Sequence, residues 1–477
     1  MTRIRNALLA LLALLAGLWA LAAWPLPPLP HYFAFRAQFM QFSGVIATGA
    51  MSVALLLAVR PVVVERLFGG LDKMYRLHKW LGITALVASV AHWWLGQGTK
   101  WMVGWGWLVR PARGGPGGPG GPGGPGARPE LPGLEGFFGH QHGLAEQIGQ
   151  YAFYAAAVLM VLALVQRFPY HLFAKTHRWI ALAWLGLVWH SVVLMKFAYW
   201  AQPLGWVMAA LLAGSTVAAG LSLFKRIGAR RRVPGTVSRV QHYPGVDTLE
   251  AVIAMGPGWP GHAAGQFAFV TVDAAEGAHP FTIASAWAAP GTAASHGAAA
   301  QATPALTPPP RPPAGSLTLL TKGLGDHTRR LPQLLQPGRT VTLEGPYGCF
   351  DFEDGQGRQI WVGAGIGITP FVARMQHLAA LGGAAAVDLF HATTVRDEAA
   401  LDRLRADARA AGVRLHLLVD AEDGRLDGAR LRQAVPDWAA ASVWFCGPPA
   451  FGRALRADLL AQGLPAGRFH QELFRMR

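Results

Sequence analysis

The sequence is poor in charged residues, in acids and in cysteine. Asp, Glu, Lys and Arg make up only 14% of its 477 residues, and 26 acidic residues stand against 42 Lys and Arg. With 52% hydrophobic residues, this composition argues against an ordinary soluble chain and predicts a membrane protein with a soluble portion. The two cysteines, Cys349 and Cys446, lie far apart, so no disulfide framework is expected.

Two motif classes are also missing from the chain. No EF-hand pattern occurs, which argues against direct control by calcium. No nucleic-acid-binding motif occurs either. Many of the Lys and Arg residues flank apolar runs, so membrane topology explains the basic balance better than a nucleic-acid partner does.

Long apolar runs fill the first half of the chain. Each run is close to the ~20 residues that a helix needs to cross ~30 Å of hydrocarbon. The runs cover residues 6–24, 41–59, 78–96, 147–166, 178–196 and 204–224. Lys and Arg gather before the first run and after the second, fourth and sixth. The runs therefore predict six helices in the inner (plasma) membrane. The positive-inside rule places both termini in the cytoplasm.

The first run has an alternative reading as a cleaved signal peptide, because MTRIR and ALAA resemble its basic start and its cleavage site. Its length favours an anchor. Two low-complexity stretches, 114–126 and 287–315, are expected to be disordered. After Arg232 short β-like runs begin, and from about residue 359 strands alternate with helices, which predicts a parallel α/β sheet.

Four histidines lie in or beside the third and fifth apolar runs: His78, His92, His177 and His190. A helix rises 1.5 Å per residue, so the fourteen residues from His78 to His92 span ~21 Å and place both rings on one face. Two such helices could clamp two stacked haems, pairing His78 with His177 and His92 with His190. Hydrogen bonding between helices is the alternative, but ionisable groups in hydrocarbon usually serve function.

The thirteen-residue spacing in the fifth run conflicts with an ideal helix. It leaves the rings of His177 and His190 about 140° apart. Either this helix is distorted, or His177 lies at its frayed start; the sequence leaves both open.

At this point the chain resembles the ferric reductase and NADPH oxidase superfamily. Its six-helix domain carries two b-type haems on histidine pairs in helices three and five, spaced thirteen or fourteen residues apart. The resemblance implies that His78, His92, His177 and His190 are axial haem ligands.

The run HPFTIAS (279–285) resembles the flavin-binding signature of the same superfamily, and TKGLGDHTRRL (321–331) resembles the strand and helix start that follow it. The resemblance implies that these runs hold FAD, with hydroxyl groups facing its ring and phosphates and a helix N-terminus near its pyrophosphate. An ordinary capped helix is the alternative for the second run. The expected FAD-binding residues are His279, Pro280, Phe281, Thr282, Ser285, Lys322, Gly325 and Thr328.

The run GAGIGITPF (363–371) directly follows the predicted strand QIWV and opens a helix. Glycines there allow the backbone to approach a pyrophosphate, and the helix aims its N-terminus at it. The run WFCGPP (444–449) resembles flavin reductases with nicotinamide donors. The expected nucleotide-binding residues are Gly363, Gly365, Gly367, Thr369, Pro370, Gly447 and Pro448.

Two residues are expected to act at the flavin itself. The resemblance places Cys446 near the nicotinamide C4 and the flavin N5, and Phe474 over the flavin; a buried structural cysteine and a packed strand residue are the alternatives. Thr393 and Arg396, after the next strand, could hold a 2′-phosphate, which favours NADPH over NADH.

The predicted architecture has three domains. A transmembrane haem-binding bundle spans 1–228, a FAD-binding β-barrel spans 233–350 with the insert 287–315, and a Rossmann-like NAD(P)H-binding domain spans 355–477. The resemblance implies that NADPH reduces FAD, that the two haems carry electrons outward, and that an acceptor receives them outside. Dioxygen, giving superoxide, is favoured; a ferric chelate or a periplasmic protein partner is the alternative. A non-enzymatic haem carrier would leave the nucleotide motifs without a purpose.

Overall fold

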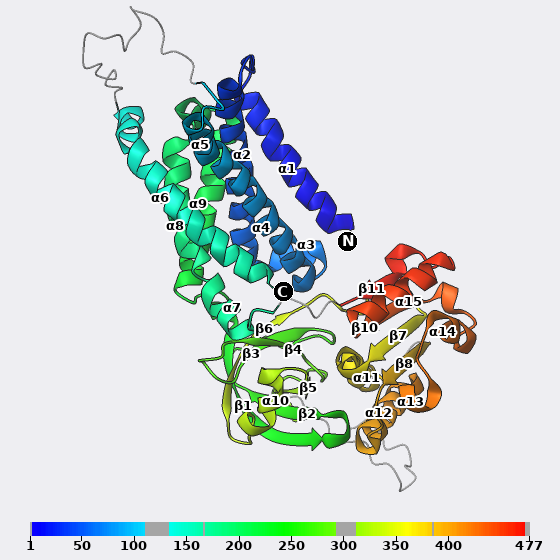
Figure 1. Cartoon of the computed structure of the whole chain (residues 1–477). Helices are drawn as coiled ribbons and strands as arrows, with labels where there is room; N and C mark the ends of the chain where they lie inside the picture. The colour runs from blue at the N-terminus through cyan, green and yellow to red at the C-terminus, as the bar shows by residue number, and fades with distance from the viewer. Residues whose placement is uncertain (1, 110–132, 166, 292–311, 384–385, 473–477) are drawn as a thin grey trace, which may run out of the picture. The chain divides into compact units, whose positions relative to one another are not determined.

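The computed structural model describes residues 2–109, 133–165, 167–291, 312–383 and 386–472. These residues fall into two compact units (Figure 1). The helical unit runs to Val64 and from Met74 to Ile227; the sheet unit takes in Glu65–Lys73 and the chain from Gly228 onward. The predicted low-complexity stretch 114–126 and the centre of 287–315 lie outside the described residues.

The helical unit consists of helices with short connections. Its main helices are α1 (Thr2–Ala22), α2 (Tyr32–Ala58), α4 (Leu71–Trp93), α6 (Gly133–Leu164), α7 (Tyr170–His177), α8 (Ile180–Leu194) and α9 (Pro203–Leu223), with the shorter α5 (Thr99–Gly104). Most of α3 (Val62–Phe68) and the first residues of α4 belong to the segment Glu65–Lys73 of the sheet unit. Helix α6 packs on α8, and α9 packs on both α2 and α8. At the centre of this packing Trp184 is buried, and its indole nitrogen donates to the Ser215 hydroxyl at 3.2 Å.

Four of the described helices are long and apolar enough to cross a membrane: Arg3–Ala22, Tyr32–Ala58, Gly133–Leu164 and Pro203–Leu223. They correspond to the first, second, fourth and sixth predicted spans. Helix α8 has only 15 residues, and the first turns of α4 carry several charged side chains. Six spans therefore remain a prediction, because two of the six helices do not meet the length and composition of a span by themselves.

The fifth predicted span is broken beside its first histidine. Helix α7 ends at His177, and α8 begins only at Ile180. Across the break, Trp179 donates to the Thr176 carbonyl at 2.9 Å and Ala181 to the Arg178 carbonyl at 3.1 Å, both three residues back. Each 3₁₀ step turns the chain by about 20° more than an α-helical step. The break thus reduces the 140° mismatch and supports the distorted-helix alternative.

The sheet unit begins with a six-stranded antiparallel sheet in the order β4-β3-β6-β1-β2-β5. Its strands are β1 (Arg232–Tyr243), β2 (Thr248–Met255), β3 (Phe267–Thr271), β4 (His279–Thr282), β5 (Ser316–Lys322) and β6 (Thr340–Tyr347). Alternate residues of β1 are buried, as expected for a strand with one face on a core. The two edge strands meet at a single bridge, Ile283–Leu319, so the closed barrel stays a prediction.

A five-stranded parallel sheet follows, in the order β11-β10-β7-β8-β9 (Figure 1). Its strands are β7 (Gln359–Ala364), β8 (Val387–Thr393), β9 (Arg414–Val419), β10 (Ser442–Cys446) and β11 (Phe469–Gln471). The surrounding helices are α11 (Thr369–Ala380), α12 (Glu398–Ala411), α13 (Asp420–Asp423), α14 (Gly428–Ala434) and α15 (Pro449–Ala461), while α10 (Asp326–Leu334) follows β5.

The strand order reverses direction between β7 and β10. The chain steps from β7 to β8 and β9 on one side, then returns to β10 and β11 on the other. Ligands of open α/β sheets bind at such a switch point, beyond the carboxyl ends of the strands. Both nucleotide motifs predicted from the sequence, after β7 and after β10, lie at this point.

Candidate functional site

The four histidines in or beside the third and fifth predicted spans form two pairs in the helical unit. The rings of His78 and His177 have centroids 6.0 Å apart, and those of His92 and His190 are 6.1 Å apart. Two imidazoles bound to opposite sides of one metal ion, each through a bond of about 2.0–2.1 Å, have centroids roughly 6 Å apart. The observed separations therefore fit one metal centre between the two rings of each pair.

Backbone carbonyls orient three of these rings. The Nδ1 atoms of His78, His92 and His190 lie 2.8, 3.0 and 2.9 Å from the carbonyl oxygens of Ala54, Met40 and Ala145 respectively. A carbonyl can only accept, so each Nδ1 carries the proton and each Nε2 keeps its lone pair. This is the arrangement that metal-binding histidines commonly have. The ring of His177 instead stacks on Phe173 at 5.0 Å.

A glycine makes room beside the second pair. A Cβ atom on Gly149 of α6 would overlap the His190 ring, whereas one on Gly44 of α2 would lie at an ordinary contact distance, 3.6 Å, from His92 Cε1. Both pair members also border a cavity of about 180 Å³. Its walls are mostly apolar, with Met51, Leu86, Phe153, Met160 and Leu187 among them. A large apolar ring system with a central metal, as in haem, fits this donor set and these walls.

The predicted flavin signature occupies β4 and the turn after it. Thr282 and Ser285 are buried, whereas His279, Pro280 and Phe281 are partly exposed. The Ser285 hydroxyl oxygen accepts a hydrogen bond from the Thr318 backbone N–H at 3.0 Å. Ser285 thus ties β4 to β5, in addition to any contact with a flavin.

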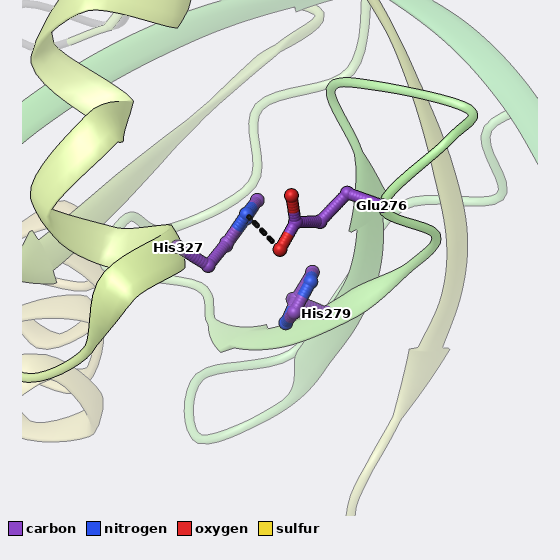
Figure 2. Close-up of side chains that lie close together, drawn as sticks. All are labelled: Glu276, His279 and His327. Atoms are coloured by element: carbon purple, nitrogen blue, oxygen red, sulfur yellow. Dashed lines mark ion pairs between the residues drawn. The ribbon is translucent and has the colours of Figure 1, made fainter. Parts of the chain in front are cut away.

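His279 stacks on a second histidine from another element. Figure 2 shows the rings of His279 in β4 and His327 in α10 lying face to face, with Glu276 beside them. The centroids are 3.7 Å apart and the planes differ by 9°. Burial lowers the pKa of His279 to about 4, so at neutral pH its ring is uncharged.

The same three side chains bring possible metal-binding atoms within 4.8 Å of one another. The geometry nevertheless does not suit a shared metal ion. The lone pair of a ring nitrogen lies in the plane of its ring, and these two planes are nearly parallel and 3.7 Å apart at their centroids. An ion in the plane of one ring would lie far out of the plane of the other. The cluster is therefore a stacked aromatic pair beside a carboxylate.

The start of α10 is capped as the sequence motif implies. The Gly325 backbone N–H donates to the Thr328 hydroxyl at 3.0 Å, and that hydroxyl donates to the Gly325 carbonyl at 3.1 Å. Both hydrogen-bonding roles of Thr328 are thus used within the cap. The backbone N–H groups at this helix N-terminus remain the natural donors for the predicted pyrophosphate.

The two nucleotide loops touch each other at the switch point. A Cβ atom on Gly367 would collide with the Cys446 carbonyl, and one on Gly447 would lie 2.8 Å from the Ala364 Cβ. Gly363 is similarly crowded by Ile368. Only glycine permits this approach, so these three predicted positions serve the packing of the loops.

The remaining nucleotide-loop residues use their side chains locally. Gly365 has φ +55°, in the left-handed region that favours glycine. Helix α11 begins at Thr369, whose hydroxyl donates to the Ile366 carbonyl at 2.6 Å, and Pro370 is its second residue. Pro448 directly precedes α15. The ligand groups left at this edge are therefore mainly backbone N–H groups.

Cys446 is the last residue of β10 and is fully buried. Burial raises the pKa of the Cys446 thiol well above its usual range, so the group stays neutral. The structure thus places an uncharged thiol at the switch point, where the sequence motif expects it. Phe474, the predicted cover of the flavin, lies outside the described residues.

A second cavity, of about 90 Å³, joins the two predicted cofactor motifs. Lys322, assigned from sequence to FAD, lines it together with Gly365 and Thr393, which were assigned to the nicotinamide nucleotide. The cavity also borders Glu250 and Arg403. Lys322 is therefore placed to meet either phosphate-bearing ligand.

The prediction for the 2′-phosphate fits the structure poorly. The Thr393 hydroxyl donates to the Val395 carbonyl at 2.9 Å. Arg396 donates through Nε to Glu422 at 3.0 Å and through Nη1 to Glu398 at 2.8 Å. The guanidinium is already paired with two carboxylates, so a phosphate would have to displace one of them.

Sequence reasoning missed three features of the site. His391 is buried in β8, where its Nδ1 lies 3.0 Å from the Gly363 carbonyl and supports the first nucleotide loop. Glu250 is buried in β2 and paired with Arg403 of α12, which ties the two sheets together. Glu472 is buried beside Cys446, and burial raises its pKa to about 8. Partners so distant in sequence leave no local signal.

Comparison with known proteins finds a family model within the first half of the chain and several partial relatives. Residues 43–188 match the family model described as "Ferric reductase like transmembrane component". An NADPH oxidoreductase of Mycobacterium tuberculosis is 35% identical over 146 residues, covering 29% of this chain and 37% of that protein. A stachydrine N-demethylase reductase subunit of Rhizobium meliloti is 29% identical over 178 residues, covering 35% of this chain and 50% of that protein. The chain thus spans half or less of the length of these relatives.

Among solved structures, the Amycolatopsis cytochrome P450 reductase GcoB matches with 22% identity and a TM-score of 0.41, over 52% of this chain and 71% of that one. A flavohemoglobin from Malassezia yamatoensis matches with 16% identity and a TM-score of 0.45, over 93% of this chain and 97% of that one. TM-scores this low decide nothing about activity.

Proposed function

Because the chain joins a ferric-reductase-like transmembrane component to a reductase module, we propose that it carries electrons from a nicotinamide nucleotide across the membrane to an outside acceptor. The observation that carries this proposal is the pair of facing histidine couples, with ring separations of 6.0 and 6.1 Å. FAD would convert a hydride into single electrons, and two b-type haems would pass them on reversibly. The chain's own residues hold and separate these groups.

The helical unit supplies the ligands and their spacing. His78 and His177 would hold the haem near the cytoplasm, and His92 and His190 the haem near the outer surface. Fourteen residues of α4 separate the two sites by ~21 Å along the helix axis. If two imidazoles hold each haem, no ligand position is left for an acceptor, which would take electrons without bonding to the metal.

The sheet unit supplies the electron donor. The backbone N–H groups after β7 and at the start of α10 would bind the pyrophosphates of the nucleotide and of FAD. Cys446, neutral and buried at the switch point, would border the nicotinamide without placing a charge there. The predicted orientation, with six spans and both termini inside, places this module in the cytoplasm beside its NAD(P)H.

Dioxygen, reduced to superoxide, is the acceptor proposed over a ferric chelate. The cavity bordering His92 and His190 is the proposed haem site, so its apolar walls do not choose between these two acceptors. The two outer histidines that could have attracted iron, His140 and His142, lie two residues apart on α6 and so do not face the same way.

A protein acceptor is the second candidate. Curated relatives include a reductase subunit and an electron transfer component, names that describe proteins working with separate partners. Copurification of a haem- or metal-containing periplasmic protein, together with faster oxidation in its presence, would favour this candidate.

The test is a set of spectra of the full chain, purified in detergent with added FAD. Reduction by a nicotinamide nucleotide should produce a b-type haem spectrum with two haems per chain, matching that produced by dithionite. Air should then reoxidise the haem and reduce a superoxide probe in a dismutase-sensitive manner. Reoxidation only by a ferric chelate would identify an iron reductase, and the lack of any haem band would refute the proposal.

A further inference from the structure

The carboxyl ends of β8 and β9 carry an excess of negative charge. The segments 394–398 and 420–425 follow these two strands. Together they contain five acidic residues and two arginines. The acids are Asp397, Glu398, Asp420, Glu422 and Asp423, and the arginines are Arg396 and Arg425.

Both arginines face carboxylates in this cluster. Arg396 forms a two-pronged ion pair with Glu422, and a further one with Glu398 at 2.8 Å. Arg425 lies 4.0 Å from Asp420. Glu422 and Glu398 remain about half exposed, at 48% and 55% of their side-chain surface. The cluster therefore presents carboxylate oxygens to solvent, while the Arg396 guanidinium is already held by two of them. Glu398 also pairs with Arg405 at 3.2 Å, and Arg425 is 91% exposed.

The sheet order places this cluster where the far end of a dinucleotide would lie. The pyrophosphate of the donor belongs at the first turn after β7. From there β8 and then β9 are the next strands on one side. A dinucleotide crossing their carboxyl ends brings its adenosine ribose to the loops that hold Arg396 and Glu422.

A ribose hydroxyl and a 2′-phosphate would interact with these carboxylates in opposite ways: the hydroxyl is attracted and the phosphate is repelled. A ribose with two hydroxyls can donate hydrogen bonds to Glu422 or Glu398, as acidic residues do in proteins that bind NAD. A 2′-phosphate brings about two further negative charges and meets an acidic cluster in which Arg396, the arginine after β8, is occupied by Glu422 and Glu398. NADP-binding sites instead leave an arginine available for that phosphate.

We infer that this chain uses NADH in preference to NADPH, and that Glu422, through its ion pair with Arg396, determines that preference. The inference rests on the proposed function for its place in the reaction. It replaces the expectation that Thr393 and Arg396 hold a 2′-phosphate. Glu422 is a specificity-determining residue, because it acts on the adenosine end and not on the transferred hydride.

The experiment compares both nucleotides on the full chain with FAD. Wild-type protein should reduce its flavin with a kcat/KM for NADH at least roughly 100-fold above that for NADPH. Glu422→Gln removes one negative charge and weakens the hold on Arg396. It should lower the NADH-to-NADPH ratio by about tenfold or more, mainly through a lower KM for NADPH.

A matched control lies at the amino ends of the strands of the same sheet, before β7 and β10. Asp437 forms a similar two-pronged pair with Arg358, at 2.8 and 3.1 Å. Asp437→Asn should leave the nucleotide ratio unchanged. A wild-type protein that prefers NADPH, or a ratio that Glu422→Gln leaves unmoved, would overturn the inference.

Binding of fragments separates this inference from the proposed function. Titration with 5′-AMP and 2′,5′-ADP reports the adenosine site without any electron transfer. Tighter binding of 5′-AMP, with that advantage lost in Glu422→Gln, supports the inference even if neither nucleotide reduces the flavin. Failure of both nucleotides to reduce the flavin would count against the proposed function, and tighter binding of 2′,5′-ADP by wild type would count against the inference.

Discussion

In the helical unit the candidate ligands are side chains that backbone carbonyls hold in place, whereas in the sheet unit the predicted ligand side chains hold their own backbone. His78, His92 and His190 each donate to a carbonyl of a neighbouring helix. Thr328 and Thr369 instead bond to carbonyls three residues away in their own loops. The first region offers imidazole nitrogens to a ligand, and the second offers backbone N–H groups.

This difference follows from the surroundings of each region. A helix in hydrocarbon has no backbone donors to spare, because its N–H groups are bonded within the helix. Side chains must therefore supply the ligands. The carboxyl edge of a parallel sheet, in contrast, ends in loops and helix N-termini whose N–H groups lack internal partners. Removing a side chain should damage the first region most, and adding one should damage the second.

Loss of a histidine should have the largest effect. His190→Ala removes one side of the second pair, so one of the two haems should be lost and transfer to the outside acceptor should stop. The measurement is the haem content per chain together with the rate of acceptor reduction by the full protein. His140→Ala, an exposed histidine of α6, serves as the control and should change neither. Two haems retained in His190→Ala would refute the ligand assignment.

A methyl group added beside His190 tests whether the position of its ring matters when the ring itself is kept. In Gly149→Ala the new methyl group would overlap the His190 ring and force it from the Ala145 carbonyl. We expect reduced haem content or a shifted haem spectrum. Gly143→Ala lies on the same helix with no atom within 4 Å of the added Cβ, and should behave as wild type. Equal spectra for both variants would show that the ring tolerates the displacement.

The reverse test applies to the sheet unit. Gly367→Ala places a methyl group against the Cys446 carbonyl, so the two nucleotide loops must separate. Overpacking of this kind destabilises a fold by about 1–3 kcal/mol. We also expect weaker nucleotide binding, measured as a raised KM for flavin reduction, with Gly357→Ala as a control in open space. An unchanged KM would mean that the loop contact does not shape the nucleotide site.

A further test of the sheet unit concerns the pH dependence of its stability. Burial raises the pKa of Glu472 from 4.5 to about 8. The protonated carboxyl therefore stabilises the fold fully below about pH 4.5, and this contribution is lost as the pH rises through about 8. The thermal midpoint of the wild-type protein should fall over that range more steeply than that of Glu472→Gln. Parallel curves for the two proteins would contradict this assignment.

Much of the architecture could be predicted from local sequence patterns. The apolar runs, the turn to a strand–helix alternation and the glycine loops all reflect neighbouring residues, and the ferric-reductase-like region over 43–188 is confirmed by its family match. The count of six spans stays a prediction, because four of the described helices are long and apolar enough to cross a membrane. Helix α8 is too short because the chain breaks after His177, and such a break depends on how the helices pack.

The candidate site divides along the same line. The spacing of His78 and His92 already determines that both rings lie on one face of a helix, because helical rotation is a local property. The sequence could not show which carbonyls the rings would bond to, or that Gly149 makes room for His190. Those contacts join separate helices.

The ion pairing of Arg396 is the clearest feature that only the tertiary structure decided. The sequence by itself determined that an arginine follows the second strand of the parallel sheet, a position that suits a 2′-phosphate. Only the fold brought Glu422, twenty-six positions further on, against its guanidinium. Electrostatic interactions depend on distance in space, so a residue's chemistry is set by neighbours that its place in the chain does not reveal.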